Sequence, residues 1–261
     1  MNTITFEAFT AGKTEGIAFS RLLEMCCIGM TPNVDPLTQS YGIVMQRRIL
    51  GKYTDRCTDN YYIAYTAEKC LSRLWTGWGK HKDAVGNFGH FLTLPECRGM
   101  GLGREVLKLW SKDMKERPDA PLALFCTAEP EIAEIYRPYG FREISSDRNG
   151  GPLYMPLGDS PATFAEFCDQ YYQPSATLIH QKATIEYRHE VDCLLRFAFA
   201  LNRLDFAMGD RYYVEDYLVA CPERVGIFLS EDGHCVGWSL DGNPRIYPLY
   251  KQSKIIETQS I

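Results

Sequence analysis

Hydrophobic and polar positions in the first 80 residues alternate in a way that predicts a strand, two helices and a hairpin. Alternating residues favour a strand, whereas apolar residues three or four apart favour a helix. The expected elements, in chain order, are a strand over 3–9, helices over 15–28 and 41–53 with a loop at 31–38 between them, and antiparallel strands over 61–66 and 70–78 joined at 67–69. The expected buried residues of the two helices are Ile17, Leu22, Leu23, Cys26, Ile43, Val44 and Ile49.

The next stretch alternates strands with helices. A strand rich in aromatic and aliphatic residues is expected over 87–94, followed by an amphipathic helix over 104–115. The residues on the apolar face of this helix are Val106, Leu107, Trp110 and Met114. The later elements are a buried strand over 121–127, a short helix over 131–137, and closing strands over 141–144 and 152–157.

The last 100 residues predict helices and then a hairpin. Helices are expected over 162–172, 176–204 and 214–220. The helix over 176–204 is predicted from apolar residues at helical spacing, which are Tyr187, Val191, Leu194, Ala198 and Leu201. A hairpin is expected over 224–240, because two apolar runs flank the turn residues Asp232-Gly233.

The candidate chemistry lies in the turn between the strand over 87–94 and the helix that follows it. This turn contains three glycines in five residues, at positions 99, 101 and 103. Glycine adopts positive φ without steric cost and lets main-chain N–H groups converge. Those groups lie at a helix N-terminus, which favours an anion. The turn therefore predicts a phosphate-binding site.

Two common phosphate motifs do not fit this turn. A Walker-type loop needs a lysine after its last glycine, and Arg104 follows Gly103 here. A dinucleotide fingerprint needs a glycine three residues after its second glycine, and those positions hold Arg104 and Val106. The spacing present is Arg98-x-x-Gly101-x-Gly103.

That spacing, with Pro95-Glu96 before it, resembles the acyl-CoA pyrophosphate loop of the GNAT superfamily of acyl-CoA-dependent N-acetyltransferases. A second segment downstream, Ile135-Tyr136-Arg137-Pro138-Tyr139-Gly140-Phe141, resembles the family's L-Y-x-x-x-G-F ending. The resemblance covers residues 1–157 and implies an α/β fold of the α+β type with a mixed sheet and splayed central strands. Residues 158–261 are then a C-terminal α+β extension, packed on the core or on a second subunit as a homodimer.

The resemblance implies that acetyl-CoA is the co-substrate and assigns the residues that hold it. Its pantetheine arm would pair with main-chain groups of Phe91, Leu92 and Thr93. The N–H groups implied to hold the pyrophosphate are those of Arg98, Gly99, Met100, Gly101, Leu102, Gly103 and Arg104. Arg104 or Lys108 is a candidate for the ribose phosphate, although helix surfaces commonly carry such residues.

The resemblance also implies how the reaction runs. A neutral amine attacks the thioester carbonyl, which the N–H of Leu92 polarises, and Tyr136 acts as general acid toward the departing sulfur or donates only a hydrogen bond. Some members place a glutamate as base where this chain has Asn87. His90 is a candidate base, and a water chain or no dedicated base are alternatives. Asn87 thus differs from the family pattern, and Glu129 is a second difference, because many members have an asparagine at that position.

Composition narrows the function classes. The net charge is −5, with +1 over residues 1–150 and −6 over residues 151–261. The sequence has no stripe of basic residues, so we do not expect a nucleic-acid partner. No apolar run is long enough for a membrane span, and the N-terminus lacks signal-peptide features. Ten cysteines without a C-x-x-C pair favour free thiols and a cytoplasmic location, and no metal site is expected.

The sequence thus predicts an N-acetyltransferase that acts on a primary amine of a small molecule, amino acid or peptide. The alternative is a non-catalytic acyl-CoA-binding or sensing protein of the same fold, suggested by Asn87 and opposed by Tyr136. The acceptor, the acyl chain length, the oligomeric state and the role of residues 158–261 stay open.

Overall fold

The chain forms two compact units of mixed α/β structure. The computed structural model describes residues 3–12, 15–27, 46–144, 151–198, 200–201, 217–218 and 221–258. The first unit contains Met1–Lys80 and Asn87–Ala120, and the second contains His81–Gly86 and Pro121–Ile261. These units reflect packing and do not test the family boundary expected at residue 157, which stays a prediction.

The strands of the first unit follow one another in sheet order. They are β1 (Thr5–Thr10), β2 (Cys57–Tyr65), β3 (Cys70–Gly79) and β4 (Gly86–Thr93). The β1–β2 and β2–β3 pairs are antiparallel, which confirms the predicted hairpin. Strand β2 begins at residue 57 rather than at the predicted residue 61. The prediction missed this start because Thr58, Asp59 and Asn60 are polar, although all three are buried in the structure.

Two helices of this unit pack on the strands. Helix α3 (Leu102–Glu116) buries the four apolar residues predicted for it, Val106, Leu107, Trp110 and Met114. Helix α1 (Ile17–Cys27) buries Leu22 and Cys26, while Leu23 is half-buried. The prediction for Ile17 was wrong, because this residue opens the helix and is 55% exposed. Ile49 is buried at the end of a helical segment, whereas Ile43, Val44 and the loop at 31–38 lie outside the described residues.

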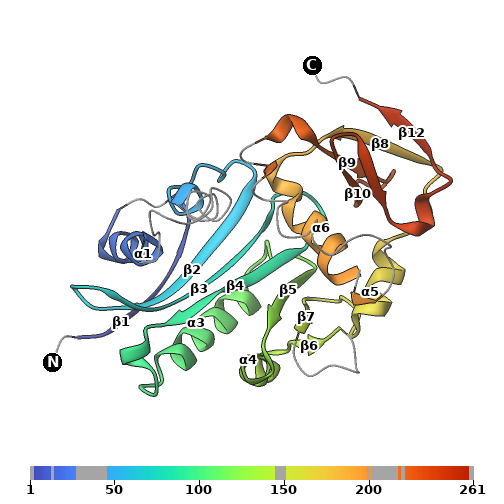
Figure 1. Ribbon diagram of the computed structural model, residues 1–261. Helices are drawn as coiled ribbons and strands as arrows, with labels where there is room; N and C mark the ends of the chain where they lie inside the picture. The colour runs from blue at the N-terminus through green and yellow to red at the C-terminus, as the bar shows by residue number, and fades with distance from the viewer. Residues whose placement is uncertain are drawn as a thin grey trace. The chain divides into compact units, whose positions relative to one another are not determined.

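The two faces of β2 pack against different helices. Tyr61 and Ile63 belong to the cluster that α1 covers, together with Trp75 of β3. Tyr62, which points to the opposite face, donates a hydrogen bond to Asp113 of α3. The strands of this unit therefore lie between α1 and α3 (Figure 1).

The second unit begins with a short antiparallel sheet. Its elements are β5 (Ala123–Ala128), α4 (Pro130–Tyr136), a 3-10 turn at Arg137–Tyr139, β6 (Arg142–Glu143) and β7 (Gly151–Pro156). Strand β7 lies between β5 and β6 and is antiparallel to both. The predicted strand, short helix and closing strands are confirmed.

An aromatic cluster joins this small sheet to the residues that follow it. Helix α5 (Phe164–Tyr171) begins at a capping box formed by Thr163 and Glu166. The rings of Phe125, Phe164 and Phe167 contact one another with centroids 5.4–6.1 Å apart, and Phe197 lies 4.7 Å from Phe125. Aromatic pairs at these distances are a large source of packing free energy.

A second sheet occupies the C-terminal part of this unit. Its strand order is β11-β10-β9-β8-β12, and β12 runs parallel to β8. The strands are β8 (Thr177–Lys182), β9 (Val225–Leu229), β10 (Cys235–Leu240), β11 (Asn243–Ile246) and β12 (Lys254–Glu257). The antiparallel β9–β10 pair confirms the predicted hairpin.

The long helix expected over 176–204 is wrong in its first part, which forms β8. Pairing with β9 on one side and β12 on the other stabilises this segment as a strand. Helical structure follows as a 3-10 turn (Ile185–Tyr187), α6 (Arg188–Asp192) and a π-helical segment (Cys193–Ala198). Val191, Leu194 and Ala198 are buried as expected, while Tyr187 and Leu201 are half-buried.

The helix expected over 214–220 falls mainly outside the described residues. Among the helices that are described, none has the length and apolar character that crossing a membrane requires.

A buried carboxylate ties the segment 81–86 to α6 within the second unit. Glu190 is 1% exposed, lies 2.9 Å from the His81 ring nitrogen, and accepts a hydrogen bond from the Val85 N–H. Burial alone would lower the pKa of His81, but the hydrogen bond and charge of Glu190 outweigh it and raise the pKa. His81 therefore carries its proton more readily in the folded protein.

We predict that stability depends on pH through this pair. Because the folded pKa of His81 is raised, its contribution is complete below the ordinary histidine pKa of about 6.5 and is lost as pH rises through the folded pKa. His81→Ala should cost about 3 kcal/mol of unfolding free energy at pH 6, since Glu190 loses a buried partner. Urea unfolding at pH 6 and pH 8.5 measures this. An equal loss at both pH values would contradict the account.

Candidate active site

The glycine-rich turn predicted from the sequence leads from β4 into α3. A 3-10 turn at Pro95–Cys97 follows the strand, and the helix begins at Leu102 with Gly101 as its N-cap. Gly99 and Gly101 adopt φ values of +81° and +79°. These lie in the left-handed region, which costs other residues about 1–2 kcal/mol. Both glycines are therefore required by backbone conformation.

Gly103 serves a different purpose. A Cβ atom at this position would lie 2.9 Å from the Phe91 ring and 3.2 Å from the Thr93 hydroxyl oxygen. The first turn of α3 thus approaches β4 closely enough that a side chain at 103 would force a shift. The three glycines fix a turn that brings the start of the helix against the strand.

The start of α3 presents main-chain donors. No side chain among the described residues caps this helix, and the N–H groups of its first turn have no partners within the helix. The helix dipole adds a partial positive charge there. The N–H of Arg98 is an exception to the predicted set, because it donates to the Pro95 carbonyl oxygen at 3.2 Å. The geometry suits an anion held by main-chain groups.

Two of the three basic side chains around this turn have partners within the protein. Arg98 donates to the Thr93 carbonyl oxygen at 3.4 Å, and Arg104 is exposed on α3. Lys108, a candidate for the ribose phosphate, forms an ion pair with Glu105 at 2.7 Å. An incoming phosphate would therefore compete with Glu105 for this ammonium.

The structure brings the predicted cofactor residues together in the first unit. They occupy the end of β4, the turn and the start of α3 in one continuous segment: Phe91, Leu92, Thr93, Arg98, Gly99, Met100, Gly101, Leu102, Gly103 and Arg104. Leu92 is half-buried and packs against the cluster beneath α1, so its main-chain position is fixed by the core.

His90 interrupts the regular geometry of β4. Its φ is +54°, which is uncommon for a residue with a side chain and breaks the regular alternation of side chains between the two faces of a strand. The imidazole is half-buried, and its ring centre lies 4.9 Å from that of Trp75. Asn87 on the same strand is buried. Strained residues of this kind cluster at functional sites.

A buried polar cluster beside His90 was missed by the sequence analysis. The Trp75 indole N–H donates to Asp59 Oδ1 at 2.7 Å, and the Arg48 guanidinium lies 4.8 Å above the Trp75 ring. Arg48 and Asp59 are both buried, with 3.9 Å between their charged atoms. No motif links these residues, because they come from three separate elements. The pairing of β2 with β3 brings Asp59 and Trp75 together, and the helical segment at 46–49 places Arg48 over the Trp75 ring.

Tyr136, the predicted general acid, ends α4 in the second unit. It is 6% exposed, and its ring centre lies 5.8 Å from that of Phe141. Burial raises the pKa of its phenol well above the ordinary value, with a smaller contribution from Cys126. The phenol is therefore protonated at neutral pH and suited to donate a hydrogen bond. Glu129, the second departure from the family pattern, is exposed at the start of α4.

Nine cysteines whose side chains the structure describes are free, and all of these except Cys221 are buried. Burial raises the pKa values of the Cys126 and Cys193 thiols, so these residues are uncharged apolar packing groups. Across the described ranges, no group of three or more His, Cys, Asp or Glu side chains is arranged to hold a metal ion.

Comparisons with known proteins found solved structures that resemble part of this chain. Solved structures similar to this chain include an acyl-CoA N-acyltransferase from Pseudomonas aeruginosa (14% identity, 59% of this chain and 99% of that chain, TM-score 0.41). They also include ElaA from Escherichia coli (13%, 59% and 99%, TM-score 0.37) and the PaiA N-acetyltransferase from Thermoplasma acidophilum in complex with coenzyme A (11%, 59% and 99%, TM-score 0.36). No curated protein matches the sequence.

The family comparison is more direct. Residues 47–152 match the model of the acetyltransferase (GNAT) domain, a range that includes β2, the glycine-rich turn, α3 and Tyr136. Over residues 47–152, the chain therefore carries a domain of the GNAT acetyltransferase family.

Proposed function

We propose that the protein is an acyl-CoA-dependent N-acyltransferase that moves an acetyl group from acetyl-CoA to a primary amine of a small molecule, amino acid or peptide. The observation that carries this proposal is the uncapped start of α3 behind a turn whose shape depends on Gly99 and Gly101. Such a helix start favours a phosphate group. The buried free thiols also fit a reducing cytoplasm.

Coenzyme A would be held mainly by main-chain groups. We assign its pyrophosphate to the N–H groups from Gly99 to Arg104, and its pantetheine arm to the main chain of residues 91–93. Lys108 would meet the ribose phosphate only by leaving Glu105. Backbone recognition of this kind explains why the turn carries glycines and hydrophobic residues rather than lysines.

Acetyl transfer requires orientation and help for the leaving sulfur. The amine nitrogen forms a bond to the thioester carbon as the carbon–sulfur bond breaks, and the N–H of Leu92 is proposed to stabilise the carbonyl oxygen. Tyr136 is proposed to donate a hydrogen bond to the sulfur. Its raised pKa favours this role over full proton transfer, because a phenol that holds its proton tightly is a weak acid.

The proton released by the amine needs an acceptor. His90 is the proposed base, since it lies in the first unit beside the buried Arg48, Asp59 and Trp75 cluster. Its left-handed backbone conformation fixes the imidazole position. Asn87, at the position where some relatives carry a glutamate, cannot take this proton. That substitution favours the second candidate function, a non-catalytic acyl-CoA-binding protein.

We predict that Gly101→Ala weakens coenzyme A binding about tenfold or more, because a methyl group in a distorted turn disturbs hydrogen bonds to a charged ligand. Gly233→Ala is the matched control. Gly233 has φ +83°, and neither glycine has an atom within 4 Å of an added Cβ. Titration calorimetry should show weaker binding of coenzyme A by Gly101→Ala than by Gly233→Ala. Thermal melting should show similar decreases in melting temperature for the two variants. Equal affinities would contradict the assigned pyrophosphate site.

We predict that Tyr136→Phe lowers kcat about 100-fold and leaves the KM for acetyl-CoA within about twofold, because only the departing sulfur needs the hydroxyl. Tyr139→Phe, in the next turn of chain, is the control and should retain activity. Release of thiol from acetyl-CoA with a panel of amines measures both. Coenzyme A binding without turnover in the wild type would favour the non-catalytic function.

We predict that His90→Asn lowers kcat/KM at neutral pH and flattens the acid limb of the pH–rate profile, because the proposed base is removed. Asparagine tolerates positive φ, so the backbone at this position is preserved. The pH–rate profile of both proteins, with thermal melting as the folding control, provides the measurement. An unchanged profile would show that the proton leaves through water or without a dedicated base.

A further inference from the structure

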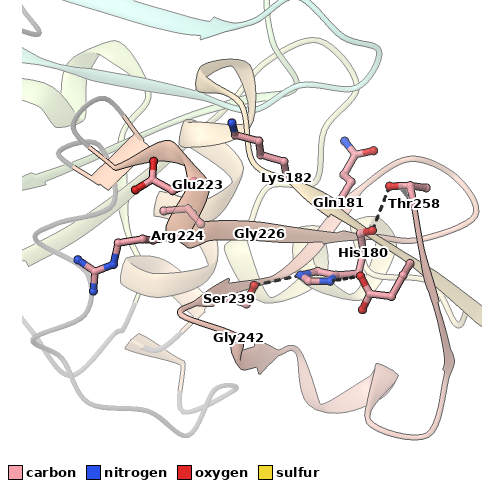
Figure 2. Close-up of a pocket in the computed structure, with 11 residues that line it drawn as sticks. His180, Gln181, Lys182, Glu223, Arg224, Gly226, Ser239, Gly242 and Thr258 are labelled. Carbon is pink, nitrogen blue, oxygen red and sulfur yellow. Dashed lines mark hydrogen bonds and ion pairs between the residues drawn. The ribbon is translucent and has the colours of Figure 1, made fainter. Parts of the chain in front are cut away.

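Three side chains of the C-terminal sheet form a hydrogen-bonded row. The Ser239 hydroxyl lies 3.0 Å from His180 Nε2, and His180 Nδ1 lies 2.7 Å from Glu257 Oε2. Figure 2 shows the His180 imidazole beside the Ser239 hydroxyl, with a dashed line marking their hydrogen bond. With the ring proton on Nδ1, His180 donates to Glu257 and accepts from Ser239. This is the hydrogen-bond pattern of an activated nucleophile, its base and an orienting group.

The sheet register creates this row from three different strands. Glu257 of β12 pairs directly with His180 of β8, and Ser239 of β10 pairs with Gly226 of β9. The imidazole passes over β9 at Gly226, where a Cβ atom would lie 2.4 Å from His180 Nε2 and 2.5 Å from the Ser239 oxygen. Only a glycine lets the histidine reach the serine two strands away.

Further contacts hold the histidine in place. The imidazole stacks on Phe228, with ring centres 4.4 Å apart. The main-chain N–H and the hydroxyl of Thr258 both donate to the His180 carbonyl oxygen, at 3.0 and 3.1 Å. Stacking therefore holds the face of the ring, and hydrogen bonds hold the main chain of His180. A general base must be held in this way if it is to take a proton from one particular atom.

The row borders a cavity. Ser239, His180 and Glu257 line a space of about 380 Å³, and Ser239 itself is only 3% exposed. This volume is in the range of small-molecule sites. Lys182 also lines it, and the register places Lys182 opposite Gly226, in the same cross-strand line as Ser239. The cavity thus combines a nucleophile and a base, with an ammonium group elsewhere in its lining.

We propose that this cavity is a second catalytic site, in which Ser239 is the nucleophile and His180 the general base for hydrolysis of small polar carboxylic esters. Glu257 is a positioning residue that holds the imidazole. This activity is separate from acyl transfer by the GNAT domain, and each can fail without the other.

The reaction balances with water as the only co-reactant. The Ser239 oxygen bonds to the ester carbon while its proton passes to His180 Nε2. The carbon–oxygen bond to the alcohol then breaks, and His180 returns the proton to the departing alcohol. Water attacks the acyl-serine, its proton passes through His180, and the acid leaves with Ser239 restored.

Reaction of the full-length protein with a fluorophosphonate probe, followed by peptide mass spectrometry, tests the proposal. A single adduct at Ser239 is expected, and Ser239→Ala should abolish it together with hydrolysis of p-nitrophenyl acetate. Ser230→Ala is the matched control, because Ser230 directly follows β9, is as buried as Ser239, and its hydroxyl accepts only from the His234 N–H among the bonds described. It should react like the wild type.

Glu257→Gln separates positioning from folding. The Glu257 side chain is 71% exposed, so thermal melting should change little. The rate of labelling and the kcat for the ester should fall at least about tenfold with KM unchanged, because glutamine no longer favours the reactive orientation of His180. Absence of an adduct at Ser239 in the folded wild type, or unchanged hydrolysis in Ser239→Ala, would overturn the proposal whatever the coenzyme A titration shows.

Discussion

The close approach of α3 to β4 determines the geometry of the GNAT domain's glycine-rich turn. Gly103 allows the contact, because any Cβ there would meet Phe91 and Thr93. The buried face of α3, which includes Trp110 and Met114, holds the helix against the sheet, so its first turn cannot retreat. The donors at the helix start are consequently placed by packing rather than by flexible side chains. Preorganisation of this kind lowers the cost of binding an anion.

The second unit shows why the residues after the family match do not form a loose appendage. The aromatic cluster around Phe125 contains rings from β5, α5 and the π-helical segment. Glu190 adds a buried hydrogen bond from α6 to the segment 81–86. These contacts pack α5, α6 and the π-helical segment against elements of the same unit. The second unit thus contains Tyr136 of the proposed acyl transfer and the whole row proposed for ester hydrolysis.

Much of this architecture could be predicted because buried apolar residues recur at the regular spacing of a helix or a strand. The apolar face of α3 and the β9–β10 hairpin are examples, and the glycine spacing located the turn. Strand β8 was missed because Thr177–Lys182 precedes residues at helical spacing, and strand pairing prevails there. Strand β12 is exposed along its length and has no burial pattern to detect. The strain at His90, the buried Asp59 and the row at Ser239 depend on register between strands, which the sequence does not encode in any local motif.

The account depends on main-chain amides at the start of α3 binding the pyrophosphate of coenzyme A. Amide chemical shifts in a ¹⁵N–¹H spectrum, followed as coenzyme A is added, test this most directly. We expect the largest changes at Gly99 to Arg104, with pantetheine alone leaving these resonances nearly unchanged. Binding that perturbs other amides while those of the turn stay fixed, or no binding at all, would contradict the account.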